Sequence, residues 1–372
     1  MGLTLMEGNE AVAWGAFDAG CRFFAGYPIT PATSIYNTML NLLPPAGGVV
    51  LQGEDEIASL GYCLGASMAG RKAMTATSGP GISLYSEHIS FALASEIPVV
   101  VVDVQRLGPS TGYATKGADG DIQFLRWGNS GGVPGIVPAP VDVADCYLLT
   151  MHAFNLAERY RCPVFIASSK EIGMTRESVD LQALERPAPV ERARNPEGDE
   201  YLPFRPAPGT DVPYFAPIGG EVLSRLTSSM HGEDGYITPD PSQIRSLVER
   251  LHRKLIAVVD RFSFHQAHLE ADSDTLLITY GVTSRAARRA CKQISEQGNP
   301  ISHLVLKTLW PVPENLIRST AAAYDRVVVV EANLGQYVRE TRRVLVGKTV
   351  TFFGSMDGKL ITPEEIMEAV HA

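Results

Sequence analysis

The segment Cys21-Arg22-Phe23-Phe24-Ala25-Gly26-Tyr27-Pro28-Ile29-Thr30-Pro31 decides the expected fold. Its apolar first half, residues 21–25, predicts a short buried strand. The two prolines exclude a helix and restrict the residues before them, so the chain should leave the strand as a stiff, extended loop. In open α/β sheets, ligands bind beside such loops at the carboxyl ends of strands. The alternative is a turn that only connects two elements.

Apolar runs and helical periodicities alternate on both sides of this segment. Strands are predicted at 49–51, 73–76, 98–104 and 163–167, and helices at 8–20, 34–43, 57–68 and 142–160. Such alternation predicts an α/β fold with a doubly wound, mostly parallel sheet. We assign residues 1–185 to this first domain.

The rest of the chain divides at a proline-rich stretch. Residues 187–217 contain eight prolines, which indicates a linker or extended arm rather than a core. We assign residues 186–256 to this arm and to a charged helix, 243–256, that Ser242 is expected to cap. A second α/β domain is predicted over 257–372, where Asn333-Leu334-Gly335-Gln336 precedes a basic helix.

Composition excludes several classes of protein. The net charge is −9 without a basic run, which argues against nucleic acid as a partner. The five cysteines are scattered, without a CxxC pair, and the eight histidines lack metal-binding spacing, so no metal site is expected on this chain. Scattered cysteines suit a reducing cytoplasm. The absence of an export signal and of an 18-residue apolar run argues against membrane insertion.

Glu56 is the first candidate for chemistry, because it opens an apolar helix directly after a strand. As one of three carboxylates, Glu54-Asp55-Glu56, it could simply favour the helix N-terminus through the helix dipole. The functional alternative is a carboxylate partly buried beside a cofactor. The turn Thr77-Ser78-Gly79-Pro80-Gly81 is a weak nucleotide signal, since it lacks GxGxxG and the lysine of a P-loop. The Gly-rich loop 108–121 is either disordered or functional.

Four segments taken in order resemble one family: Tyr27-Pro28-Ile29-Thr30-Pro31, Glu54-Asp55-Glu56-Ile57-Ala58-Ser59, Thr75-Ala76-Thr77-Ser78-Gly79-Pro80-Gly81, and Asp103-Val104-Gln105-Arg106 with Gly108-Pro109-Ser110-Thr111-Gly112. They are similar to the α subunit of the thiamine-diphosphate-dependent 2-oxoacid:ferredoxin oxidoreductases, and the 2-oxoglutarate type matches best. The resemblance covers about residues 7–180. It continues more weakly over 270–345, where the Asn333–Gln336 segment fits.

The resemblance implies a division of labour between subunits. The α subunit brings a pyrimidine-binding domain for thiamine diphosphate and a transketolase-C-terminal-like domain. A β subunit brings the domain for the diphosphate and Mg²⁺, together with a [4Fe–4S] cluster. The sequence agrees independently, because it contains neither a Gly-Asp-Gly string with a following Asn nor cluster cysteines. A separate γ subunit and a small ferredoxin-like δ subunit are the further partners expected, since the chain begins at the pyrimidine domain.

The resemblance implies roles for five residues of the first domain. Glu56 would be the thiamine glutamate, because Gly61 and Gly65 follow it at the matching distances. Its protonated carboxyl would bind the aminopyrimidine ring and favour the imino tautomer, which takes the proton from thiazolium C2. Tyr27, Pro28 and Thr30 would line the same pocket. Thr30 would also donate to the 2-oxoacid, and Arg106 would hold its carboxylate.

The expected reaction is oxidative decarboxylation of 2-oxoglutarate with CoA to succinyl-CoA and CO₂, with electrons passing to ferredoxin. A dicarboxylic substrate needs a second cation, and the 108–121 loop offers Lys116 as part of a lid. The alternatives are the same reaction on pyruvate or a branched-chain 2-oxoacid, and a non-catalytic interaction subunit. Leu107 and Asn129-Ser130-Gly131-Gly132 depart from the family pattern, which bears on the substrate rather than on the reaction type.

Overall fold

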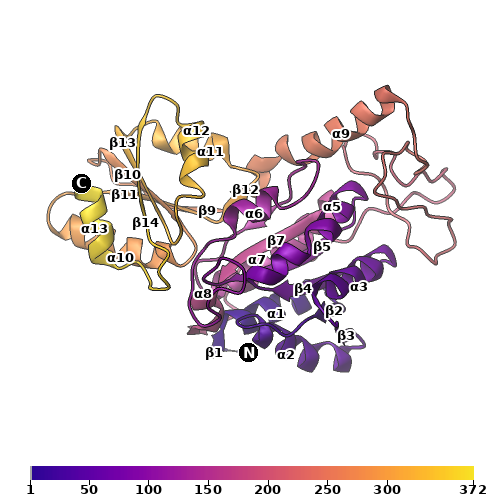
Figure 1. Ribbon diagram of the computed structural model, residues 1–372, viewed down its shortest axis with the longest axis horizontal. Helices are drawn as coiled ribbons and strands as arrows, with labels where there is room; N and C mark the ends of the chain where they lie inside the picture. Colours follow the sequence, from indigo (N-terminus) through magenta and orange to yellow (C-terminus); the bar gives the residue numbers. More distant parts are fainter. Residues whose placement is uncertain (1) are drawn as a thin grey trace.

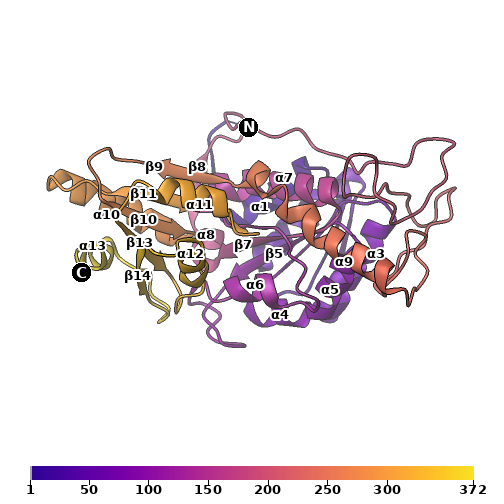
Figure 2. The same cartoon turned by 90° about the horizontal axis from the view of Figure 1, so that it is seen from above.

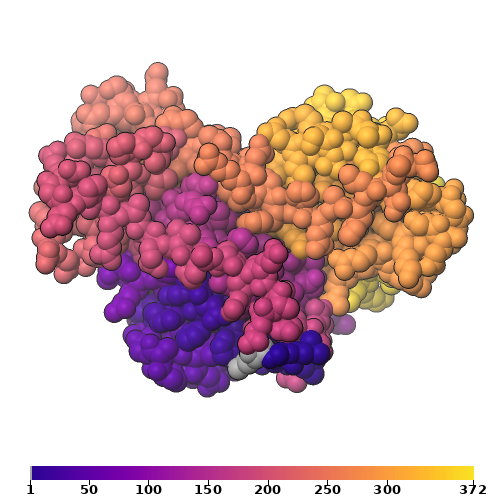
Figure 3. All heavy atoms as spheres, turned by 180° about the vertical axis from the view of Figure 1, so that it is seen from behind, coloured from indigo at the N-terminus to yellow at the C-terminus, as the bar shows by residue number. Residues whose placement is uncertain are grey.

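The computed structural model describes residues 2–372 and contains two β-sheet domains joined by a long arm (Figure 1). Seen from behind, the N-terminal domain lies at the bottom in indigo, the arm at the left in pink, and the C-terminal domain at the right in orange and yellow (Figure 3). The two domains and the arm thus form three lobes.

The first sheet has the strand order β3-β2-β4-β5-β7, and all neighbours are parallel. Its strands are β2 (Phe23–Gly26), β3 (Val49–Gln52), β4 (Ala73–Thr77), β5 (Val99–Gln105) and β7 (Pro163–Ser169). The predicted parallel sheet is confirmed. Strand β2 begins later than predicted, because the Cys21 N–H still bonds to the Ala16 carbonyl and closes the preceding helix.

The apolar run of β5 is explained by helices on both faces of the sheet. Val100, Val102 and Val104 point into a core shared with α1 (Gly8–Asp18), α2 (Thr33–Leu42) and α7 (Val143–Tyr160). Val99 and Val101 point into a core with α3 (Glu56–Met68), α4 (Gly79–Leu84) and α5 (Ser86–Ala94). A strand buried on both faces has no place for polar alternation.

The C-terminal sheet has the order β14-β13-β10-β11-β9, with β9 as an antiparallel edge. Its strands are β9 (His265–His268), β10 (Thr275–Tyr280), β11 (Ser302–Leu306), β13 (Arg326–Glu331) and β14 (Thr349–Gly354). Its helices are α10 (Thr283–Glu296), α11 (Glu314–Ala321), α12 (Val338–Val344) and α13 (Pro363–His371). Leu276 and Ile278 belong to the same core as α3, so the two domains share one continuous apolar interior.

Short elements complete the chain. Strands β6 (Val137–Pro138) and β12 (Thr308–Trp310) pair across the domains, and β1 (Thr4–Glu7) pairs with β8 (Arg176–Val179). The other helices are α6 (Ile122–Trp127), α8 (Lys170–Met174), and the short 3₁₀ turns Pro44–Ala46 and Val259–Phe262. None of these strands was predicted, because they lack the short apolar run that marks β2 and β3. No helix among residues 2–372 combines the length and apolar character that crossing a bilayer requires.

Helix α9 (Pro241–Ile256) runs diagonally between the arm and the C-terminal domain (Figure 2). The prediction that Ser242 caps this helix was wrong. Asp240 caps the helix, since its carboxylate accepts the N–H groups of Ser242 at 2.7 Å and Gln243 at 3.4 Å. Pro241 occupies the first turn, where a missing N–H costs nothing.

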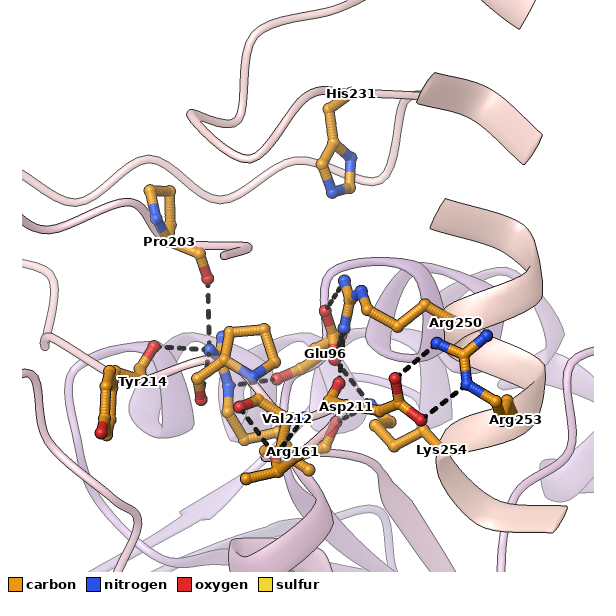
Figure 4. Close-up of polar contacts among 12 residues, drawn as sticks. Glu96, Arg161, Pro203, Asp211, Val212, Tyr214, His231, Arg250, Arg253 and Lys254 are labelled. Atoms are coloured by element: carbon orange, nitrogen blue, oxygen red, sulfur yellow. Dashed lines mark hydrogen bonds and ion pairs between the residues drawn. The ribbon is translucent and has the colours of Figure 1, made fainter. Parts of the chain in front are cut away.

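Buried charges attach the arm to the N-terminal domain (Figure 4). The carboxylate of Glu96 accepts two bonds from Arg250, at 2.6 and 3.0 Å, and one from Lys254 at 2.7 Å. Arg161 donates to the carbonyls of Glu96 and Tyr214, at 3.2 and 2.8 Å. Burial acts to raise the pKa of Glu96, but the charges of Lys254 and Arg250 outweigh it and lower that pKa to about 2. Charge pairing therefore helps to fix the arm, in addition to buried apolar side chains such as Phe215 and Leu255.

Candidate active site

Three loops meet where neighbouring strands end. The Tyr27 loop follows β2, the Thr77–Gly81 turn follows β4, and Arg106 follows β5. Strand β4 pairs with β2 on one side and with β5 on the other, so their carboxyl ends lie at one edge of the sheet. The structure thus brings together the segments that the sequence analysis singled out.

Glu56 is the one carboxylate of its cluster that points inward. It is 6% exposed, whereas Glu54 and Asp55 are exposed. Asp55 is the N-cap of α3 and accepts the Ala58 N–H at 2.8 Å. A Cβ atom at Gly81 would lie 2.7 Å from Glu56 Oε1, so only glycine leaves room for this carboxyl group.

Arg106 joins two loops at the site. Its side chain is almost buried, and Nη1 donates to the Thr30 carbonyl at 2.6 Å while Nη2 donates to the Thr111 carbonyl at 2.9 Å. Its Nε has no partner among residues 2–372. The guanidinium therefore fixes the Tyr27 loop and retains an N–H for a further acceptor.

Buried polar atoms without partners gather at the ends of β4 and β5. They are Thr77 Oγ1, Ser78 Oγ, both carboxylate oxygens of Asp103, Arg106 Nε and Asp121 Oδ2. Leaving such groups buried and unpaired costs free energy, so their concentration in one place indicates a site for a polar ligand.

Asp103 and Asp121 form a carboxyl pair next to Arg106. Burial, and then the charge of Asp121, raise the pKa of Asp103 well above its ordinary value. Burial raises the pKa of Asp121 to about 6, against the opposing effect of Asp103 and Arg106. Burial therefore favours the protonated, neutral form of both carboxyl groups. The sequence analysis missed this pair, although a carboxylate inside the run Val-Val-Val-Val-Asp-Val was a visible signal.

Asn9 holds the end of the Tyr27 loop through hydrogen bonds, and the sequence patterns did not indicate this role. It is fully buried on α1, and Nδ2 donates to the Pro31 carbonyl at 2.8 Å and to Ser34 Oγ at 2.9 Å. Gly173 lies against its Oδ1, where a side chain would collide. A polar residue in a helix of small residues was the only signal in the sequence.

Lys116 lies beside the site rather than over it. Its carbonyl accepts the Leu107 N–H at 2.8 Å, which brings its backbone next to Arg106. Its side chain is exposed and lies along Gly358 of the C-terminal domain. The 108–121 loop is packed at its second half, where Gly117 lies against the Glu171 carboxylate.

The surface around Glu56 is apolar and open. Tyr27, Val49, Leu51, Ile57, Tyr62 and Leu84 are each between 39% and 47% exposed. On α3, Gly61 faces His88, whose ring would lie 3.5 Å from a Cβ atom added at this glycine, while Gly65 faces open space. The cavities of about 440 and 530 Å³ lie in the arm and between the domains. Among residues 2–372, no group of three His, Cys, Asp or Glu side chains is arranged to hold a metal ion.

Two family models match the chain. One, described as "Pyruvate flavodoxin/ferredoxin oxidoreductase, thiamine diP-bdg", covers residues 14–275. The other, "Pyruvate:ferredoxin oxidoreductase core domain II", covers residues 273–366. The chain belongs to the 2-oxoacid:ferredoxin oxidoreductase family.

Relatives that match over nearly their full length are named as enzyme subunits. The 2-oxoglutarate synthase subunit KorA of Archaeoglobus fulgidus is 41% identical over 100% of this chain and 99% of its own length. The KorA subunit of Methanothermobacter thermautotrophicus is 40% identical over 98% of this chain and 97% of its length. The ketoisovalerate oxidoreductase subunit VorB of the same organism is 31% identical over 100% and 97%. The chain is thus more similar to 2-oxoglutarate synthase subunits than to this branched-chain enzyme.

A solved structure from the family has the same fold. The 2-oxoglutarate:ferredoxin oxidoreductase from Magnetococcus marinus, solved with 2-oxoglutarate, coenzyme A and succinyl-CoA bound, superposes with a TM-score of 0.93 at 32% identity. The match covers 99% of the present chain and 65% of the Magnetococcus chain, which is longer.

Proposed function

We propose that this chain is the α subunit of a thiamine-diphosphate-dependent 2-oxoglutarate:ferredoxin oxidoreductase. The enzyme would convert 2-oxoglutarate and CoA to succinyl-CoA and CO₂, with electrons passing to ferredoxin. The inward carboxyl of Glu56, cradled by Gly81 after β4, carries the proposal, and Arg106 after β5 bonds to Thr30 after β2 at the same edge of the sheet. The unpaired polar atoms around it fit a bound cofactor and substrate.

The residues of the site divide between cofactor and substrate, and Thr30 serves both. Thiamine diphosphate, when bound, supplies the carbon nucleophile and accepts the electron pair left by decarboxylation. Glu56 would hold a proton at a pyrimidine nitrogen, and Tyr27, Pro28 and Thr30 would line the ring's pocket. Arg106 would orient the substrate carboxylate, and the exposed Thr30 hydroxyl would donate to its 2-oxo oxygen.

A β subunit would complete the site. We assign the Mg²⁺ and diphosphate site and the [4Fe–4S] cluster to it, and we expect separate γ and ferredoxin-like δ subunits. The presence of Thr30, Glu56 and Arg106 at one edge of the sheet argues against a non-catalytic subunit. All five cysteines are free thiols, four of them buried, which suits the proposed cytoplasmic location. The reaction is tested by mass-spectrometric detection of succinyl-CoA from the purified complex; its absence would reject the proposal.

The first prediction concerns the isolated chain. Without the partner's diphosphate and Mg²⁺ ligands, the full-length chain should bind thiamine diphosphate weakly or not at all. The co-purified αβ complex should bind it with Mg²⁺ dependence. Titration calorimetry on both samples checks this. Tight, Mg²⁺-dependent binding to the isolated chain would contradict the proposed division of labour.

The second prediction concerns the distal carboxylate of the substrate. A buried, unpaired carboxylate is costly, so a cation must face it. Lys116, whose backbone pairs with Leu107, is the candidate from this chain. Lys116→Ala should raise KM for 2-oxoglutarate on the order of tenfold while hardly changing KM for pyruvate, whereas Arg106→Ala should damage both. Steady-state kinetics with both acids decide. Equal changes for the two acids would make Lys116 structural.

A further inference from the structure

The Asn333–Gln336 turn of the C-terminal domain holds the far end of the 108–121 loop. Asn333 Nδ2 donates to the Asp119 carbonyl at 2.8 Å, and the Asp119 N–H donates to the Ala332 carbonyl at 2.9 Å. Gln336 Nε2 donates to the Gly120 carbonyl. The Asp119 N–H and the carbonyls of Asp119 and Gly120 are thus all bonded to the C-terminal domain.

Gln123 extends the contact into helix α6. Its N–H donates to Gln336 Oε1 at 2.8 Å, and its Nε2 donates to the Gln336 carbonyl at 2.6 Å. The Gln336 amide therefore donates to the end of the loop and accepts from the first turn of α6. These two bonds fix the direction in which the chain passes from the loop into the helix.

The turn itself is rigid. Asn333 Oδ1 accepts the N–H groups of Gly335 and Gln336, each at 2.9 Å, and Gly335 has φ +86°, which favours glycine. Asn333 Nδ2 also donates to the Tyr280 hydroxyl at 2.7 Å, and that hydroxyl donates to Glu331 at 2.7 Å. Asn333, Tyr280 and Glu331 are all buried. The contact is therefore anchored in the core of the C-terminal domain.

The loop connects these anchored residues to Arg106. At its end, the Asp121 N–H donates to Gln105 Oε1 at 2.9 Å, directly before Arg106. In its middle, Lys116 accepts from Leu107 at 2.8 Å, and Thr111 accepts from Arg106 at 2.9 Å. The tip, residues 110–113, is exposed. It is held to the start of the loop, because the Tyr113 N–H donates to the Leu107 carbonyl at 2.8 Å, so the two ends of this part of the loop meet beside Arg106.

We propose that Asn333 and Gln336 are positioning residues, through which the C-terminal domain sets the place of Arg106 and its loop at the substrate carboxylate. This inference rests on the proposed function for its kinetic consequence. The hydrogen bonds that carry it are properties of the fold and can be tested without turnover.

The test uses Gln336→Ala in the assembled enzyme, with Asn315→Ala as the matched control. Asn315 is an exposed amide of the same domain that bonds to Asp260 at 2.8 Å, away from the loop. Hydrogen exchange of peptides covering 107–118 should become about tenfold faster in Gln336→Ala, and KM for 2-oxoglutarate should rise on the order of tenfold with kcat little changed. Asn315→Ala should change neither.

Gln123→Ala and the double variant separate positioning from general damage. Gln123→Ala should reproduce both effects, and combining it with Gln336→Ala should add little, since the two residues bond to each other. Faster exchange without a change in KM would overturn the positioning role, and unchanged exchange would overturn the anchoring itself. If the complex oxidises another 2-oxoacid, KM for that acid is the readout. If it oxidises none, the proposed function and the kinetic role fail together, while exchange still reports the anchoring.

Discussion

Glu56→Gln is expected to lower kcat of the assembled enzyme by about 10²–10⁴-fold, the range typical of a residue that positions a proton in the reaction. The amide matches the carboxyl in shape, so the pocket beside Gly81 should stay filled and the protein folded. The amide lacks the acidic proton that the pyrimidine ring needs. Viologen reduction by the complex measures the loss, and thermal unfolding checks that the fold is intact.

Glu54→Gln is the matched control, because Glu54 is exposed two residues earlier in the same cluster. It should leave kcat within about twofold, since it contacts neither the cofactor pocket nor the substrate side of the site. Full activity in Glu56→Gln, or a comparable loss in Glu54→Gln, would contradict the assignment of the thiamine glutamate.

Glu96→Gln is expected to lower the free energy of unfolding by about 3–5 kcal/mol, because removing one partner leaves the buried Arg250 and Lys254 cations uncompensated. Urea denaturation of the full chain measures this. Asp211→Asn is the control: its partner Arg253 is more than half exposed, so the loss should stay below about 1 kcal/mol. Equal losses in the two variants would mean that the Glu96 cluster does not hold the arm.

The pH dependence of stability should follow the same carboxylate. Since the pKa of Glu96 is lowered in the folded chain to about 2 from its ordinary 4.5, its stabilisation is fully present above about pH 4.5. It is lost as the pH falls from there through about 2. The difference in unfolding free energy between the unsubstituted chain and Glu96→Gln should shrink over this window.

Local pattern was enough to predict the N-terminal sheet. The valine run of β5 and the proline-restricted Tyr27 loop depend on neighbours a few residues away, and so does the position of Glu56 at a helix start. The doubly wound fold follows from such signals together. The same locality misled at helix α9, where either Asp240 or Ser242 is a good cap and only the backbone geometry decides between them.

Contacts between residues far apart in the chain could not be predicted from local sequence patterns. Glu96 meets Arg250 across 154 residues, and Gln123 meets Gln336 across 213. The Gly-rich loop 108–121 predicts a mobile lid, yet its second half is held by a turn that belongs to the other domain. Local bonds from Leu107 and to Tyr113 hold the Lys116 backbone beside Arg106, whereas the bonds that fix the second half of the loop come from the other domain. The bond from Asn9 to the Pro31 carbonyl likewise joins residues that are distant in the sequence, so no local pattern predicts it.

The most direct test of the proposed function is kcat/KM of the purified complex, with CoA and a viologen acceptor, for 2-oxoglutarate, pyruvate and 2-oxoisovalerate. We expect the value for 2-oxoglutarate to be the highest, by a factor on the order of ten or more, since pairing the distal carboxylate with a cation contributes at least that to kcat/KM. A higher value for pyruvate or 2-oxoisovalerate would contradict it.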